Sequence, residues 1–150
     1  MIWHSEIRYL GVHLIAAREY RCSHSKAKQP FYKSFNAVFG KVGRCASLDV
    51  IVELQKTKCL PSLLYGIEAC PVNMSLIRSL KFVINNAFRK IFATKSCDIA
   101  NECVLMFNCS VYDMEHKRKS KFLNELEYNE NTLCKMFQVE LSELSALYCT

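Results

Sequence analysis

The apolar periodicity of residues 74–93, "MSLIRSLKFVINNAFRKIFA", constrains the fold more than any other feature of this chain. The apolar residues recur every three or four positions and so share one face of a helix: Leu76, Leu80, Val83, Ile84, Ala87 and Ile91. The opposite face is polar and carries Arg78, Asn85 and Arg89, with Lys81 and Lys90 on its flanks. A helix of this kind is stable only when its apolar face packs against other elements.

A second amphipathic helix is predicted over residues 26–42, "KAKQPFYKSFNAVFGKV". Its apolar stripe holds Phe31, Phe35, Val38 and Val42, widened by Phe39. Pro30 suits an early helical position, and the two glycines of "GKVGR" are expected to end the helix.

Further helices are expected along the rest of the chain. Ser47 has the character of an N-cap, with Asp49 in the first turn of a helix over 48–59 that Pro61 should interrupt or kink. Residues 59–70 are apolar on nearly every side, which predicts the central helix of a bundle. Three more helices are predicted over 98–107, 112–127 and 130–147.

The segment "EIRYLGVHL", residues 6–14, differs from the rest because it is rich in β-branched and aromatic residues. It predicts one β-strand or a short hairpin, followed by a loop over 16–25. A lone strand leaves its backbone groups unpaired, so its partners are expected outside this chain. The predicted fold class is therefore mainly α: a small helical bundle preceded by one N-terminal strand or hairpin.

The composition is that of a globular chain, with 51% hydrophobic and 23% charged residues. No apolar stretch reaches the length of a membrane span, and the N-terminal residues do not form a secretory signal. We therefore expect no membrane association and a reducing, intracellular setting, with nucleus and cytoplasm undistinguished. In that setting the nine cysteines are expected to be thiols.

The charge is unevenly distributed. Residues 1–95 hold 15 basic and 5 acidic residues, a net of +10, whereas residues 96–150 hold 5 and 9, a net of −4. A basic front half suggests an anionic partner, although a solvated basic surface explains the charge equally well.

No complete catalytic or metal site is apparent. The chain has no nucleophile elbow, no glycine-rich phosphate loop and no paired aspartates in a strand-like context. Cys97, Cys103 and Cys109, with His116 beyond them, lack the closely spaced ligand pair typical of structural zinc. We therefore expect no catalytic residue, no metal and no cofactor in this chain.

Basic side chains on rigid helices are the candidates for a binding site. Such residues make sequence-independent contacts to phosphates. The candidates are Lys33, Lys41, Arg44, Arg78, Lys81 and Arg89.

Several segments together resemble the C-terminal part of the reverse transcriptase of non-LTR, LINE-type retrotransposons. "EIRYLGVHL" resembles the primer grip, and "FYKSFNAVFGKVGRCAS" followed by "KCLPSLLYGIEAC" resembles the start of the thumb. "LKFVINNAFRKIF" and "MFNCSVYDMEHKRKSKFL" continue the same pattern.

The resemblance implies a division into a primer-grip strand and loop (1–25), a thumb-like basic bundle (26–95) and a C-terminal helical extension (96–150). Tyr9, Leu10 and Gly11 match the primer grip, and Gly11 would let a nucleic-acid backbone approach closely. The family's catalytic aspartate pair and its Mg²⁺ belong to a palm domain that would lie upstream, and no adjacent aspartates occur here.

The implied function is that of a non-catalytic fragment of an RNA-directed DNA polymerase. Its expected partners are an RNA–DNA or RNA template–primer duplex and the rest of a reverse transcriptase. Two alternatives stay open: a helical domain that binds protein through residues 59–70 and the strand edge of 6–14, and a non-functional remnant of a retroelement.

Overall fold

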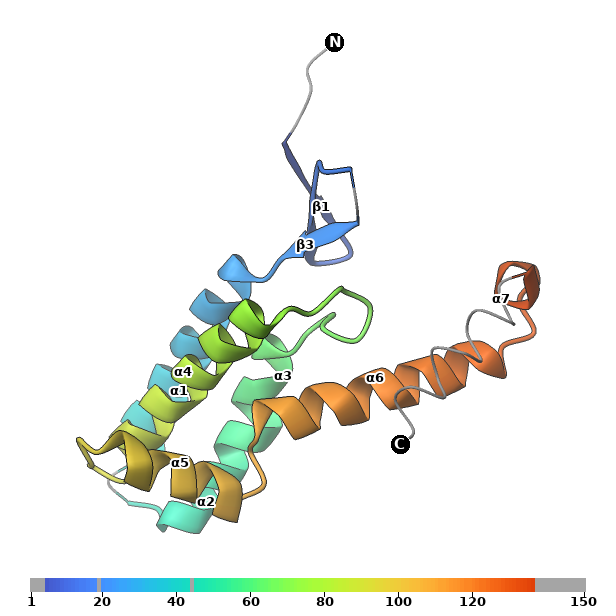
Figure 1. Ribbon diagram of the computed structural model, residues 1–150. Helices are drawn as coiled ribbons and strands as arrows, with labels where there is room; N and C mark the ends of the chain where they lie inside the picture. The colour runs from blue at the N-terminus through green and yellow to red at the C-terminus, as the bar shows by residue number, and fades with distance from the viewer. Residues whose placement is uncertain (1–4, 19, 44, 137–150) are drawn as a thin grey trace.

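A computed structural model describes residues 5–18, 20–43 and 45–136, apart from the side chain of Leu133 (Figure 1). It is mainly helical, with a small antiparallel sheet at the N-terminal end, which confirms the predicted fold class. The strands are β1 (Glu6–Tyr9), β2 (Val12–Ile15) and β3 (Arg21–Ser23). The helical elements are the 3-10 turn η1 (Ser25–Ala27), α1 (Lys28–Val42), α2 (Leu48–Leu54), the π-helical turn η2 (Gln55–Cys59), α3 (Leu60–Leu63), α4 (Met74–Ile91), α5 (Cys97–Met106), α6 (Val111–Glu127) and α7 (Thr132–Met136).

The N-terminal segment pairs with itself. β1 and β2 form a hairpin in which Glu6 lies opposite Ile15 and Tyr9 opposite Val12. Leu10 and Gly11 make its two-residue turn, with φ of +46° and +84°. Positive φ at both central residues suits the twist of a hairpin, and glycine adopts it readily. The expectation that the whole strand depends on partners outside the chain is wrong, because the break in alternation at Leu10 and Gly11 is a turn.

The predicted loop over 16–25 contains a third strand. β3 pairs with β2, placing Leu14 opposite Cys22, and η1 leads from β3 into α1. The Cys70 sulfur lies 2.6 Å from the Cys22 sulfur, so β3 also contacts the turn that precedes α4. The sheet is thus attached to the helices at its β3 side, and β1 is the outer strand.

Helices α1 and α4 lie side by side in the same direction (Figure 1). Lys28 near the start of α1 hydrogen-bonds Ser79, and Lys90 near the end of α4 donates to Asn36 at 2.9 Å. The Lys90 ammonium also lies 5.2 Å from the centre of the Phe39 ring. These lysines therefore help to join the two helices rather than forming a free basic surface.

The predicted apolar stripes form the core. Phe31 and Phe35 of α1 and the apolar face of α4 are buried, as expected. Val104, Cys109 and Val111 belong to the same hydrophobic cluster, so α5 and the start of α6 pack on it. From there α6 extends away from the bundle (Figure 1). The division at residues 25 and 95 depends on charge and resemblance and stays a prediction.

The segment 48–70 differs from expectation at two points. Pro61 does not interrupt the helix, because the π-helical turn η2 precedes it and α3 continues through it. The predicted helix over 59–70 ends at Leu63, and Gly66 turns the chain with φ of +71°. The segment is nevertheless central, since most of its apolar side chains are buried: Cys59, Leu60, Leu63, Leu64, Ile67 and Cys70.

No described helix has the length and apolar character that a membrane crossing needs. Within the described ranges, no group of three or more histidine, cysteine or acidic side chains is arranged to hold a metal ion. The cysteines in these ranges, Cys97, Cys103 and Cys109 among them, are free thiols.

Candidate nucleic-acid interface

A hollow of about 950 Å³ lies between the hairpin, the start of α1 and the turn after α3. We call it the hairpin hollow. Its position follows from β3 and η1, which place the hairpin beside the N-terminal end of α1 (Figure 1). Its lining residues are Arg8, Gly11, Val12, His13, Ser23, His24, Lys26, Ala27, Gln29, Pro30, Lys33, Ser62 and Tyr65.

The hairpin hollow is basic. Arg8, Lys26 and Lys33 line it, together with two histidines, and no carboxylate does. Glu6 nearby accepts a hydrogen bond from Lys26 at 3.2 Å and lies 2.8 Å from His13 Nδ1. Lys26 is therefore partly neutralised, whereas Arg8 and Lys33 have no carboxylate partner among the described residues. These two exposed cations are suited to an anion in the hollow.

The primer-grip-like turn borders this hollow. The Tyr65 hydroxyl donates to the Leu10 carbonyl at 2.9 Å, and a Cβ placed on Gly11 would lie 3.0 Å from the Tyr65 ring. A Cβ on Gly66 would meet Val12 Cγ2 at 2.7 Å. Gly11 thus has a role within the fold, because it admits the ring of Tyr65. Its expected role as the point where nucleic acid approaches stays a prediction.

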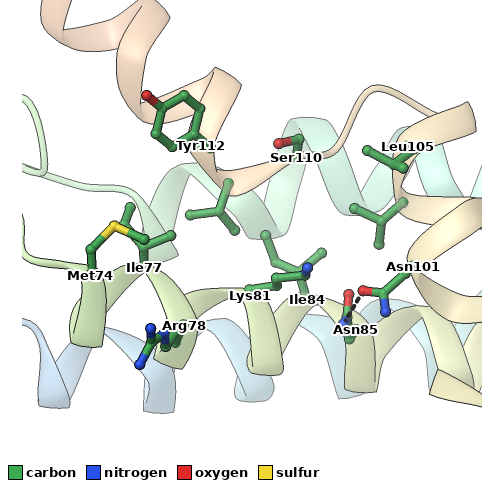
Figure 2. Close-up of a pocket in the computed structure, with 12 residues that line it drawn as sticks. Met74, Ile77, Arg78, Lys81, Ile84, Asn85, Asn101, Leu105, Ser110 and Tyr112 are labelled. Carbon is green, nitrogen blue, oxygen red and sulfur yellow. Dashed lines mark hydrogen bonds between the residues drawn. The ribbon is translucent and has the colours of Figure 1, made fainter. Parts of the chain in front are cut away.

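The structure separates the five predicted basic residues that it describes. Lys33 lines the hairpin hollow, and Lys41 is exposed at the far end of α1. Arg78 and Lys81 line a second hollow, between α4, α5 and α6 (Figure 2). Arg89 is half-buried on α4, and Arg44 lies outside the described residues. Three of the predicted cations therefore line two separate hollows, and the described ones do not form one continuous surface.

Sequence patterns alone did not select three residues of the hairpin hollow that could contact a ligand, Arg8, Lys26 and Tyr65. Arg8 precedes the turn, Lys26 lies in η1, and Tyr65 follows α3. The hairpin brings β1 close to the start of α1. Interpreting residues 6–15 as a hairpin would therefore make Arg8 and Lys26 candidates as well. Tyr65 had no such signal, since its position depends on the turn at Gly66.

His24 is the buried titratable group of the hollow. Its two ring nitrogens are inaccessible to solvent and have no hydrogen-bond partner among the described residues. Burial lowers the pKa of His24 from its ordinary value of 6.5, and the negative charge of Glu68 partly opposes this effect. The folded chain therefore favours the neutral imidazole.

This shift predicts a loss of stability in mild acid. A histidine whose pKa is lower in the folded state binds fewer protons than its unfolded counterpart, so the free energy of unfolding falls as the pH drops below about 6.5. Urea unfolding at about pH 7.5 and pH 5 should show that His24→Gln removes part of this loss. His116→Gln on α6 serves as the control and should retain it. Equal pH dependence of all three proteins would contradict the prediction.

Comparisons with protein-family models, with curated proteins and with solved structures each gave no match to this chain.

Proposed function

We propose that this chain binds a nucleic-acid template–primer duplex and has no catalytic activity of its own. The observation that carries the proposal is the position of the turn at Tyr9–Gly11. This turn, which resembles a primer grip, borders the same hollow as Arg8 and Lys33. In the sequence, the primer-grip-like turn was selected by resemblance and Lys33 by its charge on a helix. Gly11 of that turn and Lys33 line the same hollow, which supports the proposal.

The chemistry of the hollow suits a phosphate backbone. Arginine and lysine bind phosphates through charge-assisted hydrogen bonds, and these contacts carry most sequence-independent affinity. Tyr9 and Tyr65 are 64% and 55% exposed. Exposed aromatic rings beside cations are the usual means of contacting an unstacked base or a sugar at a strand end.

We further propose that the chain is a fragment of a retroelement RNA-directed DNA polymerase, with the rest of that enzyme as a partner. β1 supports this proposal, because it is the outer strand of the sheet and its residues are all exposed. Ile7 is 60% exposed and Leu10 74%. An exposed strand edge with apolar side chains is a natural place for another strand to pair. Under this proposal, any Mg²⁺ would be held by the palm domain of that enzyme and not by this chain.

Neutralising the two unpaired cations tests duplex binding. Fluorescence anisotropy would compare the protein with Arg8→Gln/Lys33→Gln on an RNA–DNA hybrid across about 50 to 300 mM salt. Removing two phosphate contacts should reduce the slope of log K against log salt by roughly 1.5 to 2 and weaken binding about tenfold or more at the lowest salt. The variant leaves Glu6, His13 and Lys26 unchanged.

Lys58→Gln/Lys95→Gln is the matched control. Both lysines are exposed and line neither hollow. Replacing them lowers the net charge by two, as Arg8→Gln/Lys33→Gln does. Affinity and slope should be nearly those of the unaltered protein. If both double variants weaken binding equally, the interaction depends on net charge and not on the hairpin hollow. If the folded protein does not bind the hybrid, the proposal fails.

Strand addition is the second candidate function, favoured by the same exposed edge of β1. Here a peptide of another protein would pair with β1 in extended form. Most apolar side chains of residues 59–70 are packed in the core, and Tyr65 is the large one left exposed, so this second proposal depends mainly on β1. Two results together would favour this function. The chain would fail to bind the RNA–DNA hybrid, and it would bind a protein partner with an affinity that does not fall as salt is raised.

A further inference from the structure

The second hollow has a different character. Helix α4 forms one side, and α5 and the start of α6 form the other (Figure 2). Its volume of about 340 Å³ is at the small end of the range for small-molecule sites. It is lined by Met74, Ile77, Arg78, Lys81, Ile84, Asn85, Asn101, Val104, Leu105, Ser110, Val111 and Tyr112. We call it the α4–α6 pocket.

Much of the pocket lining is apolar. Ile84, Val104 and Val111 are buried, and Ile77 is half-buried. Leu105 and Tyr112 are 64% and 59% exposed although both line the pocket. An apolar enclosure with exposed apolar residues at its edge favours a flat or hydrophobic group of a ligand.

Arg78 and Lys81 give the pocket a positive charge. They lie three residues apart on α4, on neighbouring positions of the helix surface. No carboxylate lines the pocket, and the described residues provide neither cation with an ion-pair partner. The complementary group is therefore an anion, and two adjacent cations suit a phosphate.

An amide pair provides the polar contacts. Asn85 donates through Nδ2 to Asn101 Oδ1 at 2.8 Å. The Oδ1 atom of Asn85 is buried and has no partner among the described residues. An unsatisfied buried acceptor is costly, so a ligand that donates a hydrogen bond here would remove the penalty.

Together these features match one class of ligand. We propose that the α4–α6 pocket binds a nucleoside monophosphate, with its phosphate on Arg78 and Lys81 and its base between the apolar side chains. An exocyclic amino group or ring N–H of the base would donate to Asn85 Oδ1. Bases in protein pockets are held in this way, by apolar side chains against their faces and hydrogen bonds at their edges.

A fatty carboxylate fits the apolar walls and the cations but not the amide. Its hydrocarbon chain would leave Asn85 Oδ1 unsatisfied, whereas a base would not. The nucleotide could be free or the phosphorylated end of a strand, since the chemistry recognised is the same. The proposal uses no residue of the hairpin hollow and does not depend on duplex binding there.

Isothermal titration of the full chain with AMP, GMP, CMP and UMP tests the proposal. At least one monophosphate should bind, and the matching nucleoside and ribose 5-phosphate should each bind about tenfold more weakly or worse. Dodecanoate tests the fatty carboxylate, and a 5′-phosphorylated oligonucleotide distinguishes a strand end from a free nucleotide. Preference for dodecanoate, or equal binding of ribose phosphate, would overturn the proposal.

Variants locate the site. Arg78→Gln/Lys81→Gln changes exposed residues and should weaken binding about tenfold or more, and Asn85→Leu should also weaken it. Lys58→Gln/Lys95→Gln should leave it unchanged. Arg8→Gln/Lys33→Gln should likewise retain nucleotide binding, which separates this proposal from the proposed function. Circular dichroism checks that each variant is folded, and binding that survives in folded Arg78→Gln/Lys81→Gln would overturn the proposal.

Discussion

Replacing Phe88 with alanine is expected to lower the free energy of unfolding by about 3–5 kcal/mol. Phe88 is fully buried in α4. Its ring centre lies 6.0 Å from that of Phe92 and 6.3 Å from that of Phe107, which follows α5. Alanine would remove a large apolar side chain and leave a cavity where α4 meets the end of α5. For a domain stabilised by roughly 5–15 kcal/mol, this is a large fraction of the total.

Urea unfolding followed by circular dichroism measures the effect. Phe82→Ala on the same helix is the control, because Phe82 is 62% exposed and its removal leaves little or no cavity. Its change should be within about 1 kcal/mol. Similar losses for both variants would mean that Phe88 is not enclosed as the structure shows, and that α5 does not pack against α4 in this way.

Phe88 also shows what periodicity can and cannot predict. The apolar stripe of α4 was identified from spacing alone, and its members are buried or half-buried as expected. Phe88 is not part of the predicted stripe, and it lies at the margin of that helix face, yet it is fully buried. Phe107 covers it, and that contact joins residues far apart in the sequence. The centre of a helix face is thus predictable from local pattern, while its margins depend on tertiary packing.

The same distinction applies to turns. At Leu10 and Gly11 the sequence signalled an irregularity, but a bulge and a turn both explain a glycine within a strand pattern. At Pro61 the proline rule predicted a break or a kink, and the helical path continues through it after the π-helical turn η2. The expected central helix ends at Leu63, and Gly66 then turns the chain with a positive φ, which apolar periodicity does not reveal.

The grouping of the predicted binding residues could not be read from the sequence, for a related reason. Helix geometry selected Lys33, Arg78 and Lys81 as solvent-facing cations, and Lys33 indeed borders a hollow. It did not indicate that Arg78 and Lys81 line another hollow, which α4 forms together with α5 and α6. A hollow is formed by three or more elements, so the spacing within one helix does not show which residues of the other elements complete it. Charge identifies candidates, and only the packing assigns them to sites.

A second large effect is expected at Gln55, where a substitution should stabilise the protein. Gln55 is 1% exposed in η2, and neither its Oε1 nor its Nε2 atom has a hydrogen-bond partner among the described residues. Burying such an amide costs about 1–3 kcal/mol, and methionine has a similar shape without the polar groups. Gln55→Met should therefore raise the free energy of unfolding by about 1–3 kcal/mol, or the midpoint by roughly 2–4 °C per kcal/mol.

Thermal unfolding of Gln55→Met and of Lys58→Met shows whether the Gln55 amide is buried without hydrogen bonds or is hydrogen-bonded. Lys58 lies in the same π-helical turn but is exposed, so its replacement should change stability by no more than about 0.5 kcal/mol. A stabilised Gln55→Met would mean that the buried amide of Gln55 lowers the free energy of unfolding of the natural chain. Gln55 lies in the π-helical turn η2, just before Pro61. A destabilised Gln55→Met would instead mean that the amide is hydrogen-bonded, because removing a satisfied buried amide forfeits its bonds and strands its partners.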